Sequence, residues 1–245
     1  MPAFPLTDFE HAAIIQVAMD EEAAPFFDLT EESGESFTVG LAEFYPRVVQ
    51  NTGQKILLVR SKIGLVNATA AITVALQLAP KAPVVVSAGT AGGLHTGVNV
   101  GDVVVGSEYT YTDADATAFG YVRGQVPGMP EKFLTPDSLL DAARAIAEAD
   151  SEHTFHVGPM LAGGSFVTAH NVADTREVFP DALSTDMETT AIAQVCTNFN
   201  VPFIATRAVS DLCGPTADQV FHMEVDIVAP ISARMAIALI HSMKN

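Results

Sequence analysis

The sequence predicts a single α/β domain in which helices pack on a mostly parallel or mixed sheet. A chain of 245 residues suits one such domain. Its hydrophobic content of 49% supports a large core, and a chain of this length buries roughly 70% of the surface that its unfolded form exposes. Short runs rich in Val and Ile alternate with segments of helical spacing, which is the pattern of helices layered on a sheet.

Four apolar runs predict buried strands, because they are rich in β-branched residues and are flanked by turn residues. In chain order they cover residues 12–17, 55–59, 83–87 and 203–209. The second of the four lies between polar stretches, and the fourth ends just before a polar Ser-Asp pair. We therefore expect these runs to form the interior of the sheet.

Helical spacing predicts three helices between these strands and one after them. Residues 67–78 place small and apolar side chains on one face, and residues 136–149 begin with Pro136, which suits a first helical turn. A third helix is expected over 187–198. The last helix is expected within 223–243, where Pro230 either starts or kinks it.

The segment 109–130 differs from the rest of the chain, since it is rich in glycine and proline with Phe119 and Tyr121 among them. This composition predicts a long loop. Long loops in compact domains are usually functional. No repeat, low-complexity tract or linker interrupts the sequence, so we expect one domain over 1–245.

Charge and cysteine content exclude several classes of function. The net charge is −17 and the 12 Lys and Arg residues form no cluster, so nucleic acid is not expected as a partner. The two cysteines, Cys196 and Cys213, form neither a disulfide framework nor a zinc site, and Cys196 is expected to be a small core residue. No signal peptide or apolar run of roughly 18 residues is apparent, which predicts a cytoplasmic protein with no membrane contact.

Three carboxylates have surroundings that suit catalysis. The strand 203–209 delivers Asp211 at its carboxyl end, where ligands collect in open α/β sheets. Glu188 opens a predicted helix, and Glu22 follows the first strand. Each also has a structural alternative. Asp211 can be a loop or helix-cap residue whose carboxylate is solvated. Glu188 fits the capping box that begins at Thr185. Glu22 is one of three acids suited to a first helical turn.

The segment 88–93, AGTAGG, follows a predicted strand and offers backbone N–H groups that could bind an anion. It lacks the Lys-Ser/Thr pair of a P-loop, so binding of a nucleoside triphosphate is not expected.

Several long motifs resemble those of the bacterial 5′-methylthioadenosine/S-adenosylhomocysteine nucleosidases. The resemblance extends from 19–22 to Phe221. It is carried by DMETTA (186–191), NFNVPF (198–203), RAVSD (207–211), AGTAGGL (88–94), VGDVV (100–104), DADATAFGY (113–121) and GQVPG (124–128). It implies a nucleoside phosphorylase-like fold, a single-domain three-layer α/β sandwich with a mixed central sheet, acting as a homodimer.

The resemblance also implies a function and roles for the acids. The expected reaction is hydrolysis of the N-glycosidic bond of 5′-methylthioadenosine and S-adenosylhomocysteine, which releases adenine and serves methionine recycling. Asp211 would protonate the purine N7, Glu22 would activate water, and Glu188 would hold the ribose hydroxyls. No metal and no cofactor are implied. Asp186 stands where the family commonly has Glu, so its role stays open.

The remaining implied site residues form three groups. Met187, Arg207, Ser210 and Thr90 would surround the ribose and the water, with Thr90 standing where Ser is common. Phe166 and Val167 would recognise adenine, and the less favoured alternative is that both belong to the plain core. Met19, Ile63 and Phe221 match the pocket for the 5′-alkylthio group, to which a second subunit would contribute Ala116, Phe119, Tyr121 and Pro127.

Three other functions remain open from the sequence. A purine nucleoside phosphorylase of the same fold would need arginines for phosphate, but no arginine lies near Glu22 in the sequence, and this acid would repel phosphate. A futalosine-type nucleosidase shares the fold and much of the site. A non-catalytic storage or binding relative would be expected to lose the acids, and this chain keeps all three.

Overall fold

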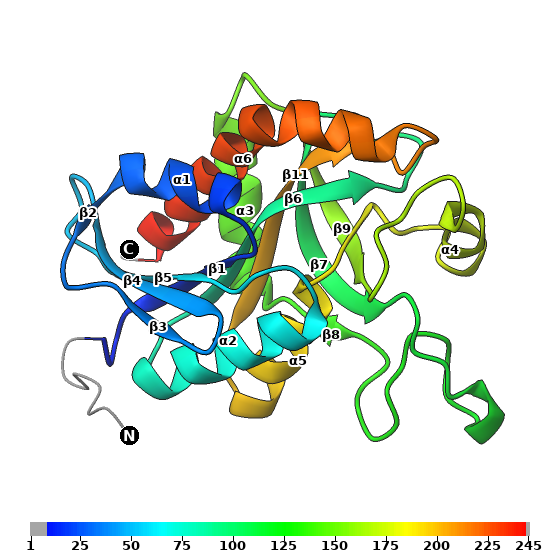
Figure 1. Ribbon diagram of the computed structural model, residues 1–245, viewed down its shortest axis with the longest axis horizontal. Helices are drawn as coiled ribbons and strands as arrows, with labels where there is room; N and C mark the ends of the chain where they lie inside the picture. The colour runs from blue at the N-terminus through cyan, green and yellow to red at the C-terminus, as the bar shows by residue number, and fades with distance from the viewer. Residues whose placement is uncertain (1–8, 244–245) are drawn as a thin grey trace.

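The computed structural model describes residues 9–243, apart from the side chains of residues 218, 219, 222 and 223. A mixed sheet runs through the molecule (Figure 1). Its strand order is β10 (Ser184–Asp186), β9 (Phe155–Ala162), β7 (Val103–Tyr111), β11 (Phe203–Asp211), β6 (Val85–Gly93), β1 (Ala13–Val17), β5 (Lys55–Arg60), β4 (Ala42–Val49) and β2 (Thr30–Glu32). Its centre is parallel, since β6 pairs in parallel with β1 and β11, whereas β7 and β4 pair antiparallel with β11 and β5. The predicted α/β class and mixed sheet are confirmed.

All four predicted strands are present. They are β1 (Ala13–Val17), β5 (Lys55–Arg60), β6 (Val85–Gly93) and β11 (Phe203–Asp211). The last two are longer than predicted. The segment 88–93 belongs to β6 and is not a turn, and Asp211 is the last residue of β11.

The remaining strands within 9–243 were not predicted. These are β2 (Thr30–Glu32), β3 (Phe37–Val39), β4 (Ala42–Val49), β7 (Val103–Tyr111), β8 (Phe133–Leu134), β9 (Phe155–Ala162) and β10 (Ser184–Asp186). Short β10 matters most for the site, because it pairs with both β9 and the end of β6. Through β10, the strands β6, β11, β7 and β9 close into a small barrel at one end of the sheet.

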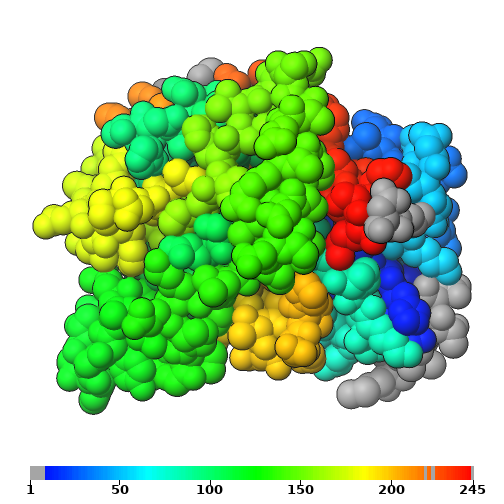
Figure 2. Space-filling view, turned by 180° about the vertical axis from the view of Figure 1, so that it is seen from behind, coloured from blue at the N-terminus to red at the C-terminus, as the bar shows by residue number. Residues whose placement is uncertain are grey.

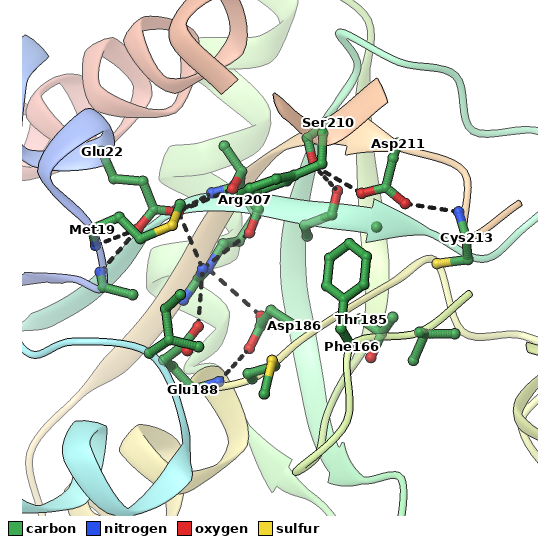
Figure 3. Close-up of a pocket in the computed structure, with 18 of the residues that line it drawn as sticks. Met19, Glu22, Phe166, Thr185, Asp186, Glu188, Arg207, Ser210, Asp211 and Cys213 are labelled. Atoms are coloured by element: carbon green, nitrogen blue, oxygen red, sulfur yellow. Dashed lines mark hydrogen bonds and ion pairs between the residues drawn. The ribbon is translucent and has the colours of Figure 1, made fainter. Parts of the chain in front are cut away.

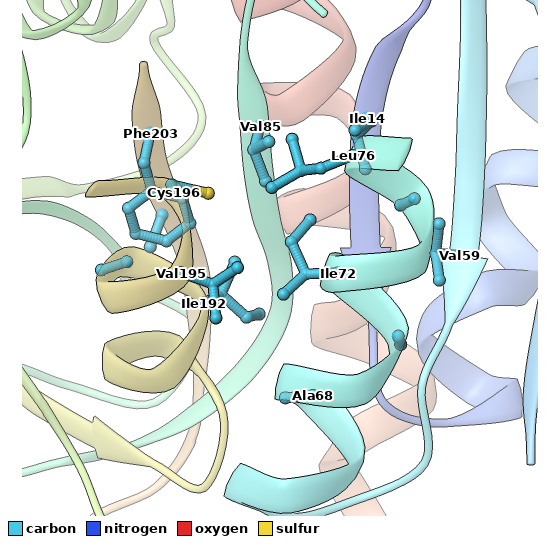
Figure 4. Close-up of a cluster of buried hydrophobic side chains, with 14 of the residues drawn as sticks. Ile14, Val59, Ala68, Ile72, Leu76, Val85, Ile192, Val195, Cys196 and Phe203 are labelled. Carbon is cyan, nitrogen blue, oxygen red and sulfur yellow. The ribbon is translucent and has the colours of Figure 1, made fainter. Parts of the chain in front are cut away.

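Helices cover both faces of the sheet, as the predicted three-layer arrangement requires. One face carries α1 (Asp20–Leu29), α3 (Asp137–Ala149) and α6 (Ala217–Ser242), and the other carries α2 (Leu65–Leu78) and α5 (Thr189–Phe199). Short α4 (Val172–Val178) lies outside these layers. In Figure 4, Ile72 of α2 and Ile192 of α5 meet beneath strand residues such as Val85. Cys196 is part of this core, as predicted.

Helix α6 corrects two expectations. It begins at Ala217, so Pro230 lies inside the helix and does not start it. Its stretch Glu224–Ser242 spans 19 residues with a mean hydropathy of 1.4, so one helix does reach the length and composition of a membrane span. This helix packs on β11, β6 and α1 and half of the stretch is buried in the protein, as expected of a core helix.

The segment after β7 is a long loop, as predicted, although residues 109–111 still belong to the strand. It holds one 3₁₀ turn, η1 (Thr117–Phe119). The loop projects from the body of the protein and is visible in green at the lower left of Figure 2.

Candidate active site

The pocket opens where strand β6 changes its neighbour. On one side β6 pairs with β11 from Val85 to Gly92, but on the other side its first three residues pair with β1 and its last two residues pair with β10. Between these partners the strand leaves backbone groups available to side chains. Loops and the N-terminal parts of α1 and α6 surround this gap.

Most of the predicted site residues line this one pocket (Figure 3). They are Met19, Glu22, Ile63, Thr90, Phe166, Val167, Met187, Glu188, Arg207, Ser210, Asp211 and Phe221. The pocket also includes Thr185, Asp186 and Cys213, which were not predicted as site residues. The four loop residues, Ala116, Phe119, Tyr121 and Pro127, do not line it.

Glu22 takes the place of a strand partner beside β6. Its Oε1 accepts hydrogen bonds from Thr90 N at 2.8 Å and Thr90 Oγ1 at 3.0 Å. Its Oε2 accepts from Ala18 N at 2.9 Å and Met19 N at 3.3 Å at the start of α1. The structural interpretation of Glu22 is therefore confirmed, since it stabilises the first turn of α1, and its carboxylate also lines the pocket, where the catalytic interpretation requires it.

A glycine makes this approach possible. Gly89 has a φ of +133°, and a Cβ there would lie 2.3 Å from Glu22 Oε1. Any side chain at this position would displace the carboxylate. The glycines of 88–93 thus reflect close packing of β6, with Gly89 against Glu22, Gly92 against Cys213 and Gly93 against Leu212, and they do not indicate an anion-binding turn.

Arg207 is the buried cation of the site. Its Nη1 donates to Thr90 O at 3.0 Å and its Nη2 to Ser87 Oγ at 2.9 Å. It also lies 3.5 Å from Glu188 Oε2 and 3.9 Å from Glu22 Oε1. Burial alone would lower the pKa of Arg207, but the surrounding carboxylates outweigh it and raise the pKa, so the guanidinium stays charged.

Glu188 does not form the predicted capping box. Its Oε1 accepts from Gly64 N at 2.8 Å, and its Oε2 faces Arg207. Burial raises the pKa of Glu188 to about 7, although Arg207 opposes the shift. This carboxyl is therefore held at the pocket by groups distant in sequence. Although Glu188 is the N-cap residue of α5, its side chain makes no hydrogen bond to the start of the helix.

Asp186 supplies the cap that was expected from Glu188. Its Oδ1 accepts from Glu188 N and Thr189 N, each at 2.8 Å, and its Oδ2 lies 3.6 Å from Arg207 Nε. The open question about Asp186 thus has a structural answer, because it fixes the start of α5 and with it Glu188. The capping preference of Asp could have identified it.

Asp211 lies on the other side of the pocket. Its Oδ1 accepts from Cys213 N at 2.8 Å and its Oδ2 from Ser210 Oγ at 3.1 Å. Burial raises the pKa of Asp211 more than these hydrogen bonds lower it. The neighbouring thiol of Cys213 is buried as well, and burial raises its pKa to about 12, so it is neutral at pH 7. Asp211 therefore retains a proton more readily than a solvated aspartate.

Apolar side chains form the walls of the pocket. Phe166 and Phe221 contact edge to face, with ring centroids 5.9 Å apart. Val167 is buried, while Ile63 is about half exposed at 49%. These walls can hold a flat aromatic base and an apolar substituent, with the acids at defined points on either side.

The comparisons with known proteins agree with this arrangement. The family model described as the phosphorylase superfamily matches residues 12–244. The chain therefore belongs to the phosphorylase superfamily. Its mixed sheet and its acid-lined pocket at the strand ends agree with this assignment.

Individual relatives place the chain more narrowly within this superfamily. The chain is 38% identical over 211 residues to 5′-methylthioadenosine/S-adenosylhomocysteine nucleosidase of Staphylococcus carnosus, covering 85% of this chain and 90% of the relative. The Neisseria meningitidis nucleosidase, solved with methylthio-immucillin-A, matches with a TM-score of 0.89, 34% identity and coverage of 95% and 99%. Futalosine hydrolase of Helicobacter pylori matches with a TM-score of 0.86, 26% identity and coverage of 95% and 98%. The chain is thus a member of the 5′-methylthioadenosine/S-adenosylhomocysteine nucleosidase family.

Proposed function

We propose that this protein hydrolyses the N-glycosidic bond of 5′-methylthioadenosine and S-adenosylhomocysteine, releasing adenine and the 5′-thioribose product. Family membership supports the reaction. The observation that carries the proposal is the pairing of a buried carboxyl of raised pKa, Asp211, with a second hydrogen-bonded carboxylate, Glu22, in one pocket. Two carboxyl groups with different environments suit an acid and a base.

The geometry supports a role for each group. Asp211 donates its proton to N7 of the purine, so that adenine leaves as a neutral base when the C1′–N9 bond breaks. Glu22 accepts a proton from the water whose oxygen bonds to C1′. Glu188 accepts hydrogen bonds from the ribose hydroxyls. Arg207 holds Glu22, Asp186 and Glu188 in place through its contacts with all three.

Water is a better candidate for the nucleophile than phosphate. Among the described residues that line the pocket, Arg207 is the cationic side chain, and its donors already contact Thr90 O, Ser87 Oγ and the carboxylates. Glu22 lies where an attacking phosphate would need a cation. The arrangement therefore favours hydrolysis over phosphorolysis.

Adenine release is expected to be independent of phosphate, and the sugar product is expected to be free methylthioribose. The assay incubates the protein with methylthioadenosine, with and without inorganic phosphate, and follows adenine by chromatography. Futalosine in a parallel reaction tests the alternative substrate. A ribose 1-phosphate product would overturn the assignment in favour of a phosphorylase.

We also infer that the active form is a homodimer with shared sites. Phe119 is 84% exposed, which is a large cost for an apolar ring left in water. The loop residues Ala116, Phe119, Tyr121 and Pro127 lie outside the pocket of their own chain. A two-fold dimer uses the same surface twice, so each loop would close the pocket of its partner.

Hybrid dimers test this arrangement. Phe119→Asp is expected to weaken association and to weaken the apparent affinity for substrates with an apolar 5′ group. Mixing Phe119→Asp chains with Asp211→Asn chains should restore some activity, since the hybrid holds one site with both changes and one with neither. Mass spectrometry shows whether hybrids form. If they form but their activity is no higher than that of the separate variants, the sites are not shared.

We further propose that the protein acts in the cytoplasm. Both cysteines are buried and unpaired, which suits the reducing cytoplasm. The proposed products, adenine and a thioribose, suit a role in methionine salvage.

A further inference from the structure

One polar group of the pocket has no use in the mechanism above. The side chain of Thr185 lines the pocket and is only 5% exposed. Within the described part of the chain its Oγ1 makes no hydrogen bond. A buried hydroxyl without a partner costs stability, so its position calls for a ligand that completes its hydrogen bonding.

Strand register places Thr185 opposite Asp211. Gly92 of β6 pairs with Thr185 of β10 on one side and with Asp211 of β11 on the other. Paired residues on adjacent strands direct their side chains to the same face. Neighbouring strands lie roughly 4.8 Å apart, so the two backbones flank Gly92 at about that distance on each side.

Gly92 lies between them and carries no side chain. A Cβ at this position would lie 2.6 Å from Cys213 Sγ and 3.3 Å from Asp211 Oδ1, so its absence lets both groups pack close to β6. Because Gly92, Thr185 and Asp211 all line the pocket, a flat ring in it can have one edge toward Asp211 and the other toward Thr185. Phe166 lies at the same part of the pocket in Figure 3.

We propose that the Thr185 hydroxyl recognises the base by donating a hydrogen bond to N3 of the purine. The inference rests on the proposed function, which places N7 at Asp211. N3 lies on the edge of the purine opposite N7 and carries a lone pair, so it faces Thr185 when N7 faces Asp211. A hydroxyl rotates freely enough to donate to it. Thr185 is thus a specificity residue for bases that present an acceptor at this position.

Thr185→Val tests the proposal, because it removes the hydroxyl and keeps the shape. We expect the dissociation constant of adenine, measured by calorimetry, and the Michaelis constant for methylthioadenosine to rise about three- to tenfold. The melting temperature should not fall, since the lost hydroxyl has no partner in the free protein. Thr185→Ser should remain within about twofold of the unaltered protein, and Thr185→Ala is a second hydroxyl-free variant.

Thr206→Val is the matched control. Thr206 is also fully buried with an unpartnered Oγ1 among the described residues, but it does not line the pocket. It should leave the adenine affinity and the Michaelis constant unchanged. If Thr185→Val behaves in the same way, Thr185 has only a structural role and the proposal fails.

Base analogues test whether N3 is the purine atom that Thr185 recognises. The unaltered protein should bind 3-deazaadenine about three- to tenfold more weakly than adenine, whereas Thr185→Val should not distinguish the two. Equal discrimination by both proteins would overturn the assignment to N3. Failure of the proposed function gives a different result, since the unaltered protein would then neither bind adenine nor release it from methylthioadenosine.

Discussion

Asp211→Asn is expected to lower kcat by roughly 10²–10⁴-fold while adenine binding changes little. Asparagine can keep both local contacts, since its oxygen can accept from Cys213 N and its amide can donate to the Ser210 hydroxyl. The variant removes the transferable proton and preserves the pocket. Steady-state kinetics together with calorimetry of adenine binding separate the two effects.

The pH profile provides a second measurement of the same role. Because burial raises the pKa of Asp211, the acid form persists to higher pH than in a solvated aspartate. The rate of the unaltered protein should fall as pH rises through this pKa, and the residual rate of Asp211→Asn should not show that fall. Asp226→Asn, an exposed change on α6, is the control. A rate for Asp211→Asn near that of the control would remove Asp211 from the mechanism.

Glu22→Gln is expected to lower kcat by roughly 10²–10⁴-fold, because the amide cannot accept a proton from water. The change should also lower the melting temperature. Both carboxylate oxygens accept hydrogen bonds, from Thr90 on one side and from Ala18 N and Met19 N on the other. The amide group of glutamine must face one of these sets of donors, which costs about 1–3 kcal/mol for the unpaired buried groups.

Glu21→Gln is the control for this variant, since the adjacent Glu21 is exposed on the same helix turn. It should keep its activity within about twofold and leave the melting temperature unchanged, as is usual for surface substitutions. Retention of adenine binding by Glu22→Gln would show that the pocket is intact. Turnover by Glu22→Gln at the rate of Glu21→Gln would exclude Glu22 as the base.

The sequence predicted the fold where local pattern and tertiary environment agree. The four central strands are mostly apolar because helices cover both of their faces. The outer strands lack that pattern. Pro46 lies within β4 and Pro159 within β9, and proline inside a run argues against a strand. Glycines likewise concealed the second half of β6, where the strand passes close to Glu22.

The candidate site was predictable residue by residue only where a long motif carried it. The bond from Gly64 N to Glu188 joins residues 124 positions apart, and no local pattern indicates it. The roles of Asp186 and Thr185 depend on how β10 pairs with β6, and a three-residue strand has too few residues to show a period. The local pattern favoured Glu188 as the cap, whereas the fold assigns that task to Asp186.

Two of the three glycines of β6 also limit how such a pocket can change during evolution. We call Gly89 and Gly92 the floor of the site: Gly92 lines the pocket and Gly89 packs against Glu22, so a side chain at either position would collide with an acid or with Cys213. Substitutions in the floor would therefore displace the proposed catalytic groups before they could alter substrate preference. Variation that redirects the proposed activity to another 5′ group is confined to the rim, at positions such as Met19, Ile63 and Phe221, which come from separate loops and from α6. The floor would stay constant while the rim diversifies.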